Sequence, residues 1–288
     1  MSYILWQYWI DETDDRIKHY PLFGGPPDKL MAIMLLWLLF VTKLGPKLMR
    51  NREPFVLRKP IMVYNFILVV INVYFVYKSV HWLEFGSKSL DPKLSAKYQW
   101  TDADIANVPD KMFYSYTKIF DLLDTVFFVL RKKFNQISFL HVYHHFMVPV
   151  MSYVVVKLGP QSVGIEVFCF LNSIVHTIMY SYYLLSAFGP WIQPYLWWKR
   201  YITRLQLIQF VLLIVYAIYC FLYGDTSGVS DGLKVVFYVQ PFVFFYMFAR
   251  FYIQSYSHKT CLNMFVGIHI CHYISEHLLK SIFKLNQS

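Results

Sequence analysis

Charged side chains are scarce in this sequence. Asp, Glu, Lys and Arg make up only 15% of its 288 residues, whereas 57% are apolar. Soluble domains carry about 25% charged and about 45–50% apolar residues, because their surface must face water. The shortage of charge therefore excludes a soluble enzyme, and the abundance of apolar residues excludes a disordered chain. The composition predicts an all-α, polytopic membrane protein.

Cysteine is also rare, with four residues in the whole chain. No two of them form a Cys-x-x-Cys pair, and Cys169 and Cys220 lie inside apolar stretches. This pattern excludes a disulfide scaffold and gives no zinc signature. The N-terminal segment lacks the basic start of a cleavable signal peptide, so we expect none. No basic patch with interleaved aromatic residues lies outside the apolar runs, so we expect no nucleic-acid partner.

Apolar windows of the length needed for a membrane-spanning helix, about 20 residues, recur along the chain. The third window is the least apolar, because Lys118, Asp121 and Asp124 lie within it. We expect seven transmembrane helices in one domain over residues 1–256. The remaining residues, 257–288, are expected to form a cytosolic tail with an amphipathic helix on the membrane surface. The seven windows lie near residues 29–48, 60–80, 112–131, 137–157, 162–186, 202–223 and 234–256.

The net charge of +10 is concentrated in alternate loops. Basic residues gather at 43–59, 131–133 and 199–204, whereas the connections at 81–111 and 224–233 lean acidic. Basic loops of membrane proteins face the cytosol. This alternation predicts a lumenal N-terminus and a cytosolic C-terminus.

Polar side chains inside membrane spans are costly and mark candidate functional sites. The spacing of His141, His144 and His145 puts three imidazoles on one helix face. With a rise of about 1.5 Å per residue, Asp124 and His144 lie roughly 10 Å from the cytosolic ends of their helices. Four predicted helices place polar residues near this depth, which indicates a single His-lined site in the cytosolic half. The polar residues of the other helices are Lys118, Asp121, Asn172, His176, Thr203, Gln206 and Gln209.

Several chemistries suit such a site. One imidazole can act as a nucleophile toward a thioester while a second serves as base, and Asn172, Gln206 and Gln209 can stabilise an oxyanion. A mononuclear zinc site would need three ligands and a water, and a di-iron oxidase would need more histidines than the core contains. A non-enzymatic transporter or proton-relay protein would use a His-lined pathway, with polar groups continuing to the lumenal face.

Four motifs occur in order between residues 118 and 210. They resemble the ordered motifs of the very-long-chain fatty acid elongases, the membrane 3-oxoacyl-CoA synthases, and the resemblance extends over roughly residues 25–256. The chain departs from the family pattern at Asp121, where Glu is usual, at Arg250, where Asn is usual, and in its tail, which lacks a dilysine signal. The motifs are Lys118-Ile-Phe-Asp121-Leu-Leu-Asp124-Thr125, His141-Val-Tyr-His144-His145, Asn172-x-x-x-His176-x-x-Met179-Tyr180-x-Tyr182-Tyr183 and Thr203-x-x-Gln206-x-x-Gln209-Phe210.

The resemblance implies an enzyme that condenses a long-chain acyl-CoA with malonyl-CoA, releases carbon dioxide and CoA, and needs neither metal nor other cofactor. It also implies residence in the endoplasmic reticulum membrane, contact with membrane lipid, and work beside the reductases and dehydratase of the elongation cycle. His144 would accept the acyl group, with His141 and His145 around it. His176 would activate the malonyl unit, and Asp124 would orient an imidazole. The substrate-binding residues would be Lys118, Asp121, Asn172, Tyr180, Tyr183, Thr203, Gln206, Gln209, Lys132, Lys199 and Arg200.

Overall fold

The protein is described by a computed structural model that covers residues 6–11, 13, 15–90, 101–158, 163–224 and 231–257. Every regular element among these residues is a helix, which confirms the predicted all-α class. The predicted amphipathic tail helix at 257–288 lies outside the described residues, apart from Ser257.

Long helices occupy six of the seven predicted windows. Within the described residues, six helical stretches are long and apolar enough to cross a membrane, so the chain is a multi-pass membrane protein. They are α2 (Asp28–Leu39) with its continuations η2 (Phe40–Leu44) and α3 (Gly45–Met49), α4 (Arg58–Trp82), α8 (Phe139–Leu158), α9 (Val163–Ser186), α10 (Lys199–Tyr223), and α11 (Asp231–Tyr252) with η7 (Ile253–Ser257). Short elements connect them: α1 (Tyr8–Asp11), η3 (Glu84–Gly86), η4 (Lys88–Leu90), α5 (Asp102–Ala106), η5 (Phe134–Gln136) and η6 (Pro190–Tyr195).

The third window differs from its prediction, because it forms two helices instead of one. α6 (Val108–Phe120) ends at Asp121, and α7 (Leu123–Leu130) begins directly after Leu122. The backbone N–H of Leu122 donates to Ile119 at 3.2 Å, three residues back, which is a tighter turn than an α-helix makes. The carbonyl of Leu122 accepts a hydrogen bond from Trp37 Nε1 at 3.1 Å. A neighbouring helix thus satisfies a backbone group at the break.

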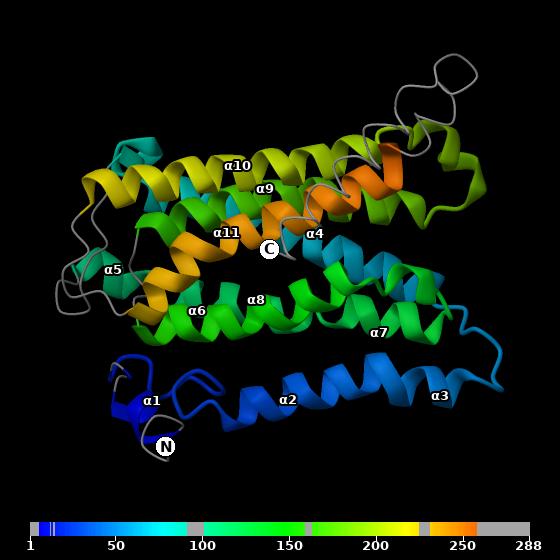
Figure 1. The fold of residues 1–288 in the computed structure, drawn as a ribbon, viewed down its shortest axis with the longest axis horizontal. Coiled ribbons are helices and arrows are strands. Elements are labelled where there is room, and N and C mark those ends of the chain that lie inside the picture. The colour runs from blue at the N-terminus through cyan, green and yellow to red at the C-terminus, as the bar shows by residue number, and fades with distance from the viewer. Residues whose placement is uncertain are drawn as a thin grey trace, which may run out of the picture.

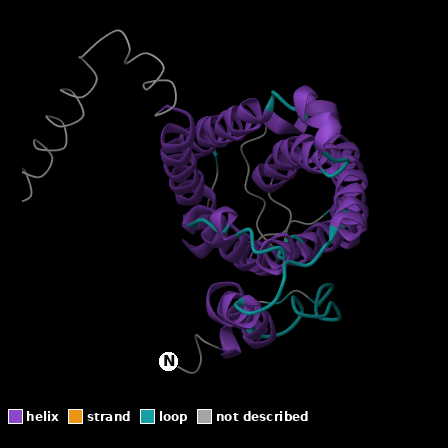
Figure 2. Ribbon diagram, turned by 90° about the vertical axis from the view of Figure 1, so that its right-hand side faces the viewer, coloured by secondary structure: helices purple, strands orange, loops and turns teal. Residues whose placement is uncertain are grey.

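The long helices lie side by side and form a ring. α6 packs against α8, α8 against α11, α11 against α10, α10 against α9, and α9 against α4. Asp110 of α6 closes the ring onto α4, because it accepts from the Tyr74 hydroxyl at 2.5 Å and pairs with Lys78 at 2.6 Å. α2 packs against α8 from outside, and Figure 2 shows the ring end-on with this extra helix beside it. Side chains that face the inside of the ring therefore meet one another.

The two ends of the bundle differ. At one end, on the right in Figure 1, α3, α7 and α9 finish in the basic loops, and we call this the basic end. Arg58 there donates to the carbonyls of Ala187, at 2.7 Å, and Phe188, which ties the start of α4 to the end of α9. The opposite end carries the N-terminal segment and α5, and we call it the N-terminal end.

Candidate active site

A small cavity inside the ring gathers side chains from α6, α8 and α9. Lys118 and Asp121 come from α6 and its end, His144 and His145 from α8, and Asn172 and His176 from α9, with Val148 and Pro149 completing the wall. Six residues that were predicted from three separate motifs therefore line one cavity. The polar side chains of each helix face the inside of the ring, because lipid offers them no hydrogen-bond partners.

The histidines form a contiguous group. The ring of His145 lies 4.2 Å from that of His141 and 5.4 Å from that of His144, measured between centroids. The third member of the box, His141, does not line the small cavity, and its Nε2 lies 2.8 Å from the Thr125 hydroxyl oxygen. His176 faces the same cavity as His144. Its Nδ1 is buried without a hydrogen-bond partner among the described residues, so that nitrogen is available to a bound substrate.

Lys118 is the cation of this site. Its Nζ lies 3.4 Å from both Asp121 Oδ2 and Asn172 Oδ1, and 4.5 Å from the centroid of the Tyr114 ring. The Tyr114 hydroxyl donates to the same Asn172 oxygen at 2.9 Å. A buried charge needs such partners. Asp121 Oδ1 is buried with no partner among the described residues, so the carboxylate retains one free acceptor.

Asp124 and Tyr180 have a different environment from the one we expected. Tyr180 is fully buried, with 0% of its surface exposed, and its hydroxyl donates to Asp124 Oδ2 at 2.9 Å. The residue beside a box imidazole is Thr125, not Asp124. Tyr180 therefore holds Asp124 in place and does not line either cavity described here.

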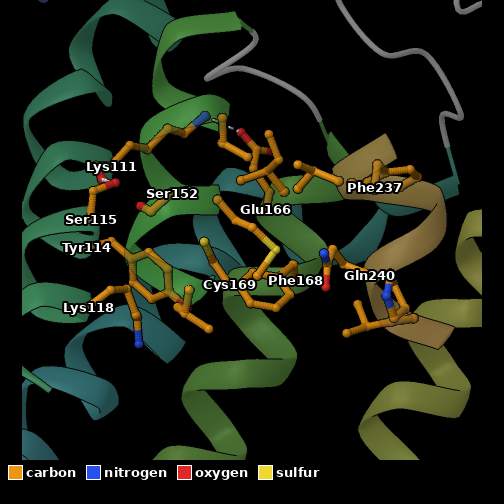
Figure 3. Close-up of a pocket in the computed structure, with 18 of the residues that line it drawn as sticks. Lys111, Tyr114, Ser115, Lys118, Ser152, Glu166, Phe168, Cys169, Phe237 and Gln240 are labelled. Atoms are coloured by element: carbon orange, nitrogen blue, oxygen red, sulfur yellow. Dashed lines mark hydrogen bonds and ion pairs between the residues drawn. The ribbon is translucent and has the colours of Figure 1, made fainter. Parts of the chain in front are cut away.

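A larger cavity of about 130 Å³ lies next to the small one, and Lys118 and Val148 line both. Most of its wall is apolar: Met151, Val155, Ile165, Phe168, Leu213 and Phe244 belong to it. It extends past Tyr114 and Cys169 toward Lys111 and Glu166 (Figure 3). Glu166 lies in window five, whereas Lys111 is the last residue of the connection 81–111, just before window three. The sequence did not indicate that the two form a site, and the charge of Glu166 inside a membrane span was the only sign.

The remaining predicted residues lie apart from the two cavities. Thr203 and Gln209 of α10 are buried, Gln206 lies 3.7 Å from Met179 Sδ, and Tyr183 is 38% exposed. Among the basic residues, Lys132 donates to the Arg50 carbonyl at 3.3 Å, and Arg200 lies over the Tyr201 ring. Lys199 is exposed at the start of α10. Lys132, Lys199 and Arg200 all lie at the basic end. α10 thus adds none of its predicted polar residues to the small cavity.

No group of three or more His, Cys, Asp or Glu side chains within the described ranges has a geometry that could hold a metal ion. The cavity nevertheless combines neutral nitrogen bases, one cation and amide groups next to an apolar space. Imidazole nitrogens can attack a carbonyl carbon or move a proton, and an ammonium or amide N–H can stabilise an oxyanion.

Comparison with known proteins gives one consistent result. Very long chain fatty acid elongase 1 of Homo sapiens is 37% identical to this chain over 262 residues, which are 88% of this chain and 90% of the human one. Very long chain fatty acid elongase 7 of Drosophila melanogaster is 37% identical over 259 residues, with coverage of 89% and 77%. Very long chain fatty acid elongase 4 of Homo sapiens is 38% identical over 274 residues, with coverage of 91% and 83%.

The family model "ELO: GNS1/SUR4 family" matches residues 23–263. This range includes all four motifs and every helix from α2 to α11. The match confirms the resemblance inferred from the motifs. On the family model and these relatives, the chain belongs to the ELO (GNS1/SUR4) family.

Proposed function

We propose that this protein is the condensing enzyme of fatty acid elongation, a 3-oxoacyl-CoA synthase. It joins a long-chain acyl-CoA to malonyl-CoA and gives a 3-oxoacyl-CoA two carbons longer, with CoA and carbon dioxide released. Family membership supports the activity. The observation that carries the mechanism is that the histidine cavity and the large apolar cavity lie next to each other, with Lys118 and Val148 lining both. Such a space holds a reactive thioester at one end and a hydrocarbon chain along its length.

In the first half-reaction, a ring nitrogen of His144 attacks the thioester carbon of the acyl-CoA. A carbon–nitrogen bond forms, the carbon–sulfur bond breaks, and CoA leaves as a thiolate that is then protonated. The neighbouring His145, 5.4 Å away between ring centroids, takes up the proton that the His144 imidazole releases. Thr125 fixes the orientation of His141, which in turn packs on His145 at 4.2 Å.

In the second half-reaction, malonyl-CoA loses carbon dioxide and the resulting enolate carbon attacks the acyl-imidazole. The new carbon–carbon bond forms as the carbon–nitrogen bond to His144 breaks, which regenerates the imidazole. The free Nδ1 of His176 hydrogen-bonds the malonyl unit, and Lys118 with Asn172 stabilises the oxyanion of the enolate. Asp121 keeps the Lys118 ammonium at that position, 3.4 Å away.

The CoA moieties would enter from the basic end, where Lys132, Lys199 and Arg200 can meet their phosphates. This places the basic end in the cytosol and the N-terminus in the lumen. We further propose residence in the endoplasmic reticulum membrane, where the reductases and dehydratase of the cycle would take up the 3-oxoacyl-CoA. A transporter is not favoured, since the middle of the large cavity is apolar.

The test is a chain-extension assay. Microsomes that contain the expressed protein receive radiolabelled malonyl-CoA and a panel of acyl-CoAs of different lengths. We expect labelled products two carbons longer, loss of more than a thousandfold with His144→Ala, and unchanged activity with His81→Ala, which alters an exposed histidine on α4. No extension of any acyl-CoA at confirmed expression would refute the proposed activity. Full activity of His144→Ala would refute only the assigned nucleophile.

A further inference from the structure

The far end of the large cavity, opposite the histidines, carries a buried ion pair. Lys111 Nζ lies 2.7 Å from Glu166 Oε1, and the two side chains are only 8% and 2% exposed. Figure 3 shows the pair at the edge of the cavity, above Tyr114 and Cys169. Desolvating two charges is costly even when they pair. If the cavity only held a hydrocarbon chain, apolar residues at these two positions would make the protein more stable.

Other polar atoms at the same end lack partners. Glu166 Oε2 and Trp82 Nε1 are both buried without a hydrogen-bond partner among the described residues, and both side chains line the large cavity. Glu166 comes from α9 and Trp82 from α4, and the Trp82 ring centroid lies 5.5 Å from Lys111 Nζ. One of the two atoms is an acceptor and the other is a donor. Buried polar atoms are nearly always satisfied in native proteins, which points to a ligand group that both donates and accepts.

We propose that the far end of the large cavity is a subsite for a hydroxyl group carried on the acyl chain, remote from the thioester. A hydroxyl donates one hydrogen bond, to Glu166 Oε2, and can accept another from Trp82 Nε1. The protein would then elongate hydroxylated long-chain acyl-CoAs in preference to unmodified ones. This proposal rests on the proposed condensing function, because the same cavity must hold the chain.

A neutral hydroxyl suits this subsite better than a charged group. A charged ligand group would be desolvated beside an ion pair that is already neutral as a whole, so no net attraction would offset its cost of burial. A methyl end would leave the free acceptor atom of Glu166 unsatisfied, which weakens binding. The hydroxyl must lie well along the chain, because Glu166 precedes His176 by ten positions on α9, or about 15 Å along the helix axis.

The experiment compares matched substrates on the full-length protein in microsomes. Acyl-CoAs of several lengths are supplied as pairs, one with a terminal hydroxyl and one without, together with radiolabelled malonyl-CoA. The measured quantity is the ratio of kcat/KM for the two members of each pair. At the length that reaches the pair we expect a ratio of about ten, since a hydrogen bond to a charged group contributes at least about a factor of ten.

The double variant Lys111→Met/Glu166→Leu removes both charges, so neither is left alone in the cavity. We expect its ratio to fall to about one or below. The matched control is Lys78→Met/Asp110→Asn, which removes the 2.6 Å ion pair between α4 and α6. Neither control residue lines the large cavity, and its ratio should stay at the wild-type value. Trp82→Phe removes only the indole N–H of the same subsite. It should also lower the ratio, and it keeps the test valid if the double variant does not fold.

The outcomes separate the two proposals. Extension of unmodified chains with a ratio below one at every length would overturn the hydroxyl subsite and leave the condensing function intact. A ratio near ten that persists in the double variant, or in Trp82→Phe if the double variant does not fold, would also overturn the subsite. Failure to extend any acyl-CoA would remove the condensing function and the inference with it.

Discussion

At the scale of single residues, hydrogen bonds between helices decide which imidazole ring has a fixed orientation and which retains a nitrogen for the substrate. Thr125 is fully buried and lies 2.8 Å from His141 Nε2, whereas Nδ1 of His176 has no partner among the described residues. A held ring can orient its neighbours, and a free nitrogen can meet a substrate. This difference supports different roles for two side chains of the same type.

Replacing Thr125 by Val removes the hydroxyl and keeps the shape. We expect kcat for chain extension to fall about tenfold, because one lost hydrogen bond contributes about 0.5–1.5 kcal/mol. Thr125→Ser should restore most of the activity. The measurement is kcat at saturating acyl-CoA and malonyl-CoA for both variants. Equal losses of kcat in Thr125→Val and Thr125→Ser would show that the hydroxyl does not contribute to chain extension.

Tyr180→Phe and Asp124→Asn test the hydrogen bond between these two residues. Tyr180→Phe removes the donor to the buried Asp124 carboxyl, and Asp124→Asn replaces a carboxyl acceptor by a weaker amide oxygen, so each should cost stability, with about 1–3 kcal/mol expected for Tyr180→Phe. The double variant should cost less than the sum, since the two residues share one interaction. Thermal unfolding in detergent measures all three. Strict additivity would mean that the 2.9 Å contact carries no coupling.

At the scale of elements, close packing at single positions sets the shape of the large cavity. Gly164 near the start of α9 and Phe237 of α11 both line this cavity. A Cβ added at Gly164 would approach the Phe237 ring to 2.1 Å, which is far inside van der Waals contact. Only glycine therefore lets α11 bring this ring against α9, and the ring helps to close the cavity.

Gly164→Ala should push the Phe237 ring from its place and shorten the space for the acyl chain. We expect the longest products to be lost, while shorter acyl-CoAs are extended at least at the wild-type rate. Chromatography of the labelled products measures the distribution. Gly25→Ala is the matched control, because a Cβ there meets no atom within 4 Å. An unchanged distribution of product lengths in Gly164→Ala would show that the Phe237 ring does not limit the length of the acyl chain.

The elements also show how far the sequence alone can lead. Periodic apolar windows predicted every long helix, because a segment in lipid must satisfy its own backbone. The break at Asp121 and Leu122 could not be predicted, since neither glycine nor proline marks it. It is supported by Trp37 from another helix, and such a contact leaves no local pattern.

At the scale of the whole molecule, the N-terminal segment is fastened to the ring by one buried cation. Lys157 at the end of α8 is 0% exposed, donates to the Trp9 carbonyl at 3.0 Å and to the Thr13 hydroxyl, and lies 5.4 Å from the Tyr153 ring centroid. Tyr153 in turn donates to the Gly25 carbonyl at 2.8 Å. The segment before α2 thus covers the C-terminal end of α8, which lies at the N-terminal end of the bundle.

Lys157→Met should loosen this segment. Charge-assisted hydrogen bonds contribute about 1.5–3 kcal/mol each, so we expect a lower unfolding temperature in detergent and faster protease cleavage before residue 28. Lys29→Met changes an exposed lysine at the start of α2 and serves as the control. Equal cleavage rates in both variants would show that Lys157 does not hold the segment.

The sequence by itself determined the membrane setting, the all-helical class, the order of the motifs and hence the family. These depend on composition and on short spacings, which act within one helix or between a helix and lipid. Tertiary structure decided which polar residues meet. Lys111 and Glu166 are 55 positions apart, and Lys157 and Trp9 are 148 apart. Such pairs form only when the fold brings distant segments together, because the packing of the helices determines which groups lie close enough to a buried charge to pair with it.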